Sequence, residues 1–127
     1  MKWLVVVGVA LLLLGCGRMA ERIPSTGRYQ VDLVVVNRVP FGFGARVASP
    51  SRIEILREYK RDEVLVAHEL CHIVQWNLHG HTFPVLYASH WLVWGYDDMP
   101  LERACKRTET DEWYLEWARD LIREHFG

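Results

Sequence analysis

Two histidines, His68 and His72, stand four residues apart in the segment His68-Glu69-Leu70-Cys71-His72. From Asp62 to Asn77 the apolar residues recur at helical spacing, which predicts a helix. Residues four apart share one helix face, so both imidazoles can reach one metal ion. Glu69 then lies beside the metal, where it can take a proton from a metal-bound water. We therefore predict one catalytic ion here, with zinc favoured by imidazole and carboxylate ligands.

The alternative is that these histidines are surface residues with a solvated Glu69 between them. His68 and His72, however, share the side of the helix that carries the apolar Leu65 and Ile73. Burying imidazoles without partners costs free energy. This placement favours metal binding.

The N-terminus has the pattern of a membrane-targeting segment. Met1-Lys2 is followed by an uninterrupted apolar run of twelve residues, Trp3 to Leu14. A membrane-spanning helix needs about 20 apolar residues, so this run has the length of a signal peptide. Leu13-Leu14-Gly15-Cys16 resembles the bacterial lipoprotein box, which implies cleavage after Gly15, a diacylglycerol on Cys16 and an acylated amine. An uncleaved anchor or an ordinary secretory signal is the alternative, and in each case the remaining chain faces away from the cytoplasm.

The predicted organisation is a signal peptide over residues 1–15, a lipidated tether over 16–27 and one domain over 28–127. About 110 residues remain after the signal, which suits a single compact domain. The formal net charge is −1, with no basic excess and no long basic run, so we expect no nucleic-acid partner.

The remaining patterns predict strands first and helices afterwards, which is typical of an α+β fold. The predicted strands are 29–36, 46–48 and 52–56. The predicted helices are 62–77, an apolar and aromatic helix over 83–94 that we expect to be buried, 100–107 and a last one to about residue 125. Pro100 can begin the third helix, and Thr108 or Thr110 can cap the last.

A catalytic zinc needs a third protein ligand and an open position. One extended motif adds a histidine six residues past the second one, with a glycine midway; here those positions are Leu78 and Gln75, which excludes that class. His79 and His81 lie in the loop just past the helix, where histidines are usually exposed.

Two segments together resemble very small bacterial and phage metallopeptidases of the gluzincin type. His68 to Gln75 is similar to the family pattern HELxHVxQ, and Gly95 to Ala104 is similar to GYxxNPxExEA, with Met99 in place of the asparagine. The resemblance covers roughly Arg46 to Arg107. It implies a minimal zincin-like fold with a short twisted sheet, an active-site helix and C-terminal helices. It also implies His68, His72 and Glu102 as ligands and Glu69 as the catalytic base. His90 and Asp98 are the reserve ligands, since zinc accepts either kind of side chain.

Two supporting features are expected near the metal. A tyrosine facing it can stabilise an oxyanion, and Tyr96 is the first candidate and Tyr87 the second. By analogy with the family, the predicted strand 52–56 supplies a sheet edge that binds an extended peptide through main-chain hydrogen bonds.

Cys71 and Cys105 remain once Cys16 is lipidated, and they form an even pair in an oxidising compartment. If the two ligand helices meet at the metal, a disulfide between these cysteines would add about 2–4 kcal/mol of stability. Two small buried thiols are the alternative, and a Cys ligand to zinc is disfavoured because adjacent helix positions cannot all face one ion.

Three functions are compatible with these patterns. The favoured one is a membrane-anchored metallopeptidase that hydrolyses a peptide or protein substrate. A non-catalytic zinc lipoprotein that binds an envelope partner is the second, although a structural zinc would not need Glu69. A metal-storage protein is the third, and a single ligand cluster argues against it.

Overall fold

The computed structural model describes residues 28–127. The predicted signal peptide, the tether and Cys16 lie outside the described residues. The elements, in chain order, are β1 (Asp32–Val36), the 3₁₀ turn η1 (Pro40–Gly42), β2 (Ala45–Ser49), β3 (Arg52–Leu56), η2 (Arg57–Tyr59), α2 (Glu63–His79), η3 (Gly80–Thr82), α3 (Phe83–Trp94), α4 (Pro100–Thr108) and α5 (Glu112–Phe126). The predicted α+β class is confirmed, since the strands precede the helices. Over residues 28–127, no helix has both the length and the apolarity needed to cross a bilayer.

The three strands form one mixed sheet in the order β1-β3-β2. β1 runs parallel to β3, and β2 runs antiparallel to it. The prediction that residues 52–56 supply a sheet edge is therefore wrong, because β1 covers the side of β3 that β2 leaves open. The strand at the edge beside the site is β2.

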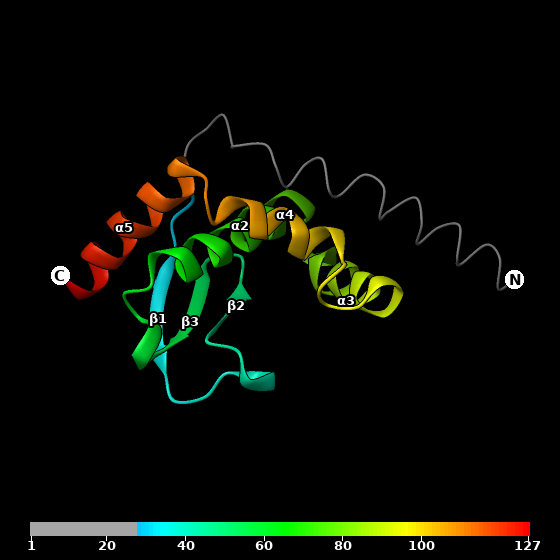
Figure 1. Ribbon diagram of the computed structural model, residues 1–127, viewed down its shortest axis with the longest axis horizontal. Helices are drawn as coiled ribbons and strands as arrows, with labels where there is room; N and C mark the ends of the chain where they lie inside the picture. The colour runs from blue at the N-terminus through cyan, green and yellow to red at the C-terminus, as the bar shows by residue number, and fades with distance from the viewer. Residues whose placement is uncertain (1–27) are drawn as a thin grey trace, which may run out of the picture.

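One face of the sheet is covered by α2 and α5 (Figure 1). Ile53 and Ile55 point to this face from β3 and are fully buried, while Glu54 lies on the other face and bonds Arg46 at 2.7 Å. Such alternation is what a strand with one solvated face requires. α2 also packs against α4 and contacts α3, so the central helix contacts the sheet and all three later helices.

Side-chain caps fix where the two longest helices begin. The Asp62 carboxylate accepts from the Leu65 amide at 3.0 Å, and Asp111 accepts from the Trp113 amide at 2.9 Å. The expectation that Thr108 or Thr110 caps α5 is wrong. Both hydroxyls donate instead to carbonyls of α4: Thr108 to Cys105 at 2.7 Å and Thr110 to Arg107 at 3.2 Å.

α3 and the start of α4 form a second, smaller core that includes Phe83, Leu86, Met99 and Leu101. His90 is fully buried in α3, and neither of its ring nitrogens has a hydrogen-bond partner. Burial, together with the nearby His79, lowers the pKa of His90 to about 4.

Replacing His90 by leucine should make the protein less sensitive to acid. The pKa of His90 is lower in the folded protein than in the unfolded chain, so only the unfolded chain takes up this proton between about pH 6.5 and 4. The free energy of unfolding therefore decreases as the pH is lowered through that window. Over two pH units this group should account for about 2 kcal/mol of lost unfolding free energy. Urea titrations of the metal-free protein at pH 7 and 4.5 measure the difference.

Ser89→Ala on the same helix is the matched control, because it removes no ionisable group. Equal losses of stability in wild type and His90→Leu would show that His90 takes up its proton in the folded state as readily as in the unfolded chain.

Candidate metal centre

The candidate site lies where α2 and α4 pack together. His68 and His72 project from successive turns of α2, and their ring centroids lie 5.1 Å apart. Glu102 approaches from the first turn of α4, which begins at Pro100. The predicted helix geometry and the placement of Glu102 thus bring these three side chains together, with one ligand atom of each within 4.8 Å of the others.

Glu102 bridges the two imidazoles. Its Oε1 lies 3.0 Å from Nε2 of His68 and 2.5 Å from Nε2 of His72. Burial alone would raise the pKa of Glu102, but the imidazoles hold it well below its usual range. Burial alone would lower the pKa of His72, yet the Glu102 carboxylate raises it to about 9. Nε2 of both imidazoles and Oε1 of Glu102 thus lie close enough together to contact a single ion.

This donor set fits a divalent metal ion. Two imidazole nitrogens and one carboxylate are the ligands of many catalytic zinc sites, and they leave a fourth position open. His72 and Glu102 are buried and His68 is partly buried, so an ion would be largely shielded from solvent.

The outer nitrogens of the two imidazoles each have a partner. Nδ1 of His72 lies 2.8 Å from Oε1 of Gln75, whose amide nitrogen donates to the Leu101 carbonyl at 2.9 Å. Nδ1 of His68 lies 3.2 Å from Oε2 of Glu109. Acceptors in these positions favour protonation at Nδ1, which leaves Nε2 free to ligate a metal.

Gln75→Ala should weaken zinc binding, because the His72 ring loses the acceptor that orients it. Loss of such an outer-shell bond typically costs 10–100-fold in metal affinity, so we expect about that decrease. Competition against a chromogenic chelator measures it. Asn77→Ala is the matched control, since the Asn77 amide bonds the carbonyls of Pro50 and Ile73, away from the site. Equal zinc affinities for Gln75→Ala and wild type would show that Gln75 does not orient the ligand.

Glu69 is in the same helix as the histidines and lines the same cleft, but it is not in the ligand cluster. Its side chain is largely buried, at 8% exposure. Burial raises the pKa of its carboxyl, whereas His72 and His68 act in the opposite direction. The geometry therefore separates Glu69 from the ligands, as a proton-transferring group requires.

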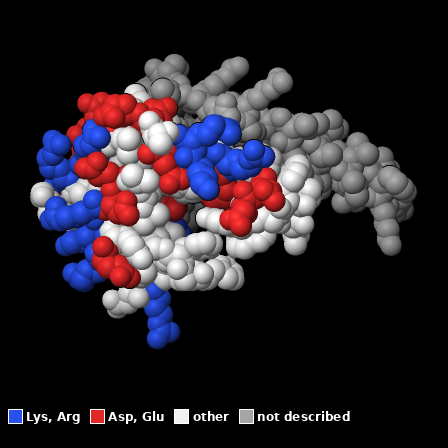
Figure 2. Space-filling view, in the orientation of Figure 1, with Lys and Arg blue, Asp and Glu red and all other residues white. Residues whose placement is uncertain are grey.

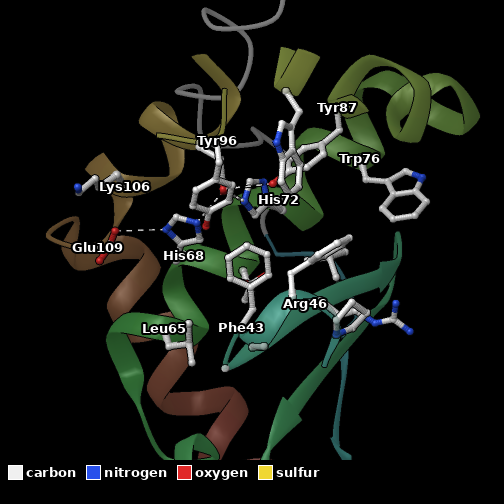
Figure 3. Close-up of a pocket in the computed structure, with 18 of the residues that line it drawn as sticks. Phe43, Arg46, Leu65, His68, His72, Trp76, Tyr87, Tyr96, Lys106 and Glu109 are labelled. Atoms are coloured by element: carbon white, nitrogen blue, oxygen red, sulfur yellow. Dashed lines mark hydrogen bonds and ion pairs between the residues drawn. The ribbon is translucent and has the colours of Figure 1, made fainter. Parts of the chain in front are cut away.

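An open cleft of about 990 Å³ leads to the three ligands. Figure 3 shows His68 and His72 directed into it from α2, with Tyr87 and Tyr96 close to the two imidazoles. The Tyr87 hydroxyl lies 3.4 Å from Oε2 of Glu102. Burial raises the pKa of both tyrosines, so their hydroxyls stay protonated at neutral pH. The two candidates for an oxyanion donor thus lie in one cleft.

Aromatic side chains form one wall of the cleft. The rings of Phe43 and Tyr96 lie 5.1 Å apart, and those of Trp91 and Tyr96 lie 5.6 Å apart. Phe41 extends this wall: its ring is 5.8 Å from Trp91, it is 83% exposed, and its backbone has the left-handed φ of 61°. Such strain in a non-glycine residue is most often retained at binding sites.

Cys71 and Cys105 form a disulfide, with their Cα atoms 5.3 Å apart. It joins the two helices that carry the ligands, immediately beside His72. Sγ of Cys105 lies 3.4 Å from Nδ1 of His72. Because the two sulfurs are bonded to each other, neither is a thiolate that could ligate a metal.

The remaining predicted residues lie away from the cluster. His79 ends α2 and His81 is in η3. The reserve ligands are not used either, since neither His90 nor Asp98 belongs to the ligand cluster or lines the cleft. Sequence reasoning missed the roles of Gln75 and Glu109. Gln75 is three residues past His72 on one helix, a spacing that could have indicated its contact, whereas Glu109 reaches His68 only through the packing of two helices.

No protein-family model matches this chain, and no match exists among the curated proteins or the solved structures. The assignment of a function thus depends on the site itself.

Proposed function

We propose that this protein is a small zinc metallopeptidase of the gluzincin type. The observation that carries the proposal is the convergence of His68, His72 and Glu102 from two helices, with Glu69 in the same cleft but outside the ligand set. A purely structural metal site would need four protein ligands and no adjacent base.

His68, His72 and Glu102 would hold the ion. When bound, zinc supplies a Lewis acid that polarises a carbonyl and lowers the pKa of a water to about 7. Glu69 accepts the proton of the attacking water and passes it to the amine that leaves, so its carboxylate is restored at the end of the cycle. The hydroxyls of Tyr96 and Tyr87 would donate to the carbonyl oxygen as negative charge develops on it.

The cleft also has features suited to a peptide. The edge strand β2 contributes Ala45, Arg46 and Val47 to its lining, and an edge strand can pair with an extended main chain. The aromatic wall faces the same space, which favours a large apolar side chain next to the scissile bond.

The location is part of the proposal. The apolar run Trp3–Leu14 and the lipoprotein box at Cys16 support a lipid anchor on the outside of a bacterial membrane. Peptides of the cell envelope are then the substrates within reach.

Metal removal and return test the proposal. The purified full-length chain should contain one zinc ion and cleave members of a mixed peptide library, and a strong chelator should abolish cleavage. Restoring zinc in equal amount to the protein should recover it. Folded, zinc-loaded protein that cleaves no peptide would instead favour the non-catalytic zinc lipoprotein.

A further inference from the structure

α3 has an unusual composition for a helix at the surface. Its sequence, FPVLYASHWLVW, contains no Lys, Arg, Asp or Glu. Its inner face buries Phe83, Leu86 and His90 against the rest of the protein. A surface helix normally places polar residues outward, whereas one that is apolar all round is buried in protein or lipid.

The outer face of α3 is apolar and open to solvent. Val85 is 71% exposed and Leu92 is 87% exposed, and Val93 beside them is 56% exposed. Ala88 lies between Val85 and Leu92 and is also exposed. Val85, Ala88 and Leu92 lie three and four residues apart and share one helix face, so they form an apolar strip, with Val93 at its border. Exposed apolar strips of this kind mark contacts with proteins or membranes.

On the face that Figure 2 shows, Lys, Arg, Asp and Glu side chains gather over the sheet, α4 and α5, and acidic side chains lie next to the visible part of α3, which is itself uncharged. Trp94 ends α3 with 39% exposure, and tryptophan is enriched where apolar and aqueous regions meet.

We propose that the outer face of α3 docks on a lipid bilayer. The chain itself indicates this occupant, since the apolar run Trp3–Leu14 and Cys16 predict membrane attachment. The eleven residues 17–27 span at most about 40 Å when extended, so an anchored domain stays within reach of the bilayer surface. A helix whose outward residues are Val85, Ala88, Leu92 and Val93 can lie in the interface with these side chains among the acyl chains.

Docking would deepen the proposed function. Tyr87 and Trp91 line the cleft from one side of α3. The exposed apolar residues of α3 lie on a different side of the helix, so α3 stands between the cleft and the proposed membrane contact. A docked α3 therefore holds the cleft alongside the bilayer, where segments close to a membrane are the accessible substrates. This consequence rests on the proposed function, whereas the docking itself does not.

Site-directed fluorescence in vesicles tests the docking. In full-length protein carrying Cys16→Ser, Leu92→Cys provides one reactive thiol, because Cys71 and Cys105 are bonded to each other. An environment-sensitive fluorophore is attached there, the protein is reconstituted from detergent into phosphatidylcholine vesicles, and the vesicle-bound protein is isolated by flotation before the measurement. Some of the lipids carry a spin label near the headgroup or near the end of the acyl chain. Val85→Cys tests a second position on the face, and Glu116→Cys on α5 is the exposed control.

The expected result is a blue shift and strong quenching at positions 92 and 85, stronger with the label near the headgroup, and neither effect at 116. Three outcomes would overturn the proposal: emission at 92 and 85 as polar as at 116, quenching at all three positions, or a blue shift without quenching. The last would mean that protein covers the face. None of these readouts needs metal or hydrolysis, so docking and the proposed peptidase activity succeed or fail separately.

Discussion

Glu69→Gln is expected to lower kcat for peptide hydrolysis by about 10²–10⁴-fold, the usual contribution of a positioned general base. Glutamine has nearly the shape of glutamate, so the buried position is filled without a cavity, but an amide cannot accept the proton of the attacking water. Zinc content should stay at one ion per chain, because Glu69 lies outside the ligand cluster. Steady-state kinetics on one cleaved peptide, with metal analysis of the same samples, measures both quantities.

Glu63→Gln is the matched control for this variant. Glu63 is on the same helix in its first turn; its carboxylate bonds Arg119 at 3.0 Å and does not line the cleft. It should retain full activity. An unchanged kcat in Glu69→Gln would show that Glu69 is not the general base. Loss of zinc together with activity would show that Glu69 helps to hold the metal.

The local features of this site are predictable from sequence because they depend on helix geometry alone. The spacing of His68 and His72 determines that both lie on one face of α2, whatever the rest of the chain does. Glu102 is different: it meets the histidines only through the packing of α4 on α2, and its prediction as a ligand came from the family resemblance.

Features that depend on long-range pairing could not be derived in this way. The strand at residues 52–56 was predicted correctly, but its position in the sheet was not. No local pattern shows that β1 and β2 pair on either side of it, which makes β2 an edge strand. At the start of α5, Asp111, Thr108 and Thr110 are all acceptable caps by type. The choice depends on where α4 ends: both threonine hydroxyls donate to carbonyls three residues earlier in that helix, which leaves the cap to Asp111.

The outer face of α3 shows a third kind of limit. Its apolar composition predicted a buried helix, which is correct for Phe83, Leu86 and His90. Composition does not say how much protein is available to cover a helix, and in this small domain Val85 and Leu92 remain exposed. A hydrophobic pattern thus identifies a surface that avoids water without identifying what covers it.

Glu102→Ala should remove the metal, because it leaves His68 and His72 as the only ligands of the cluster. We expect zinc to fall from one ion per chain to a small fraction of that in protein purified in the same way, since catalytic zinc sites depend on three protein ligands. Peptide hydrolysis should disappear with it. Mass-spectrometric metal analysis per chain measures the loss, and circular dichroism verifies that the variant is folded.

Arg103→Ala is the control here, as Arg103 follows Glu102 on α4 and lines the cleft without belonging to the ligand cluster. It should keep its zinc. Full zinc retention in Glu102→Ala would show that another residue provides the third ligand. His90 is buried in α3 and does not line the cleft, so it would have to leave this core to reach the metal. Zinc analysis of the double variant Glu102→Ala, His90→Leu would show whether it does. No zinc in folded wild-type protein, even after reconstitution, would refute the metallopeptidase proposal, because Glu69 and the tyrosines have no chemistry to perform there without the ion.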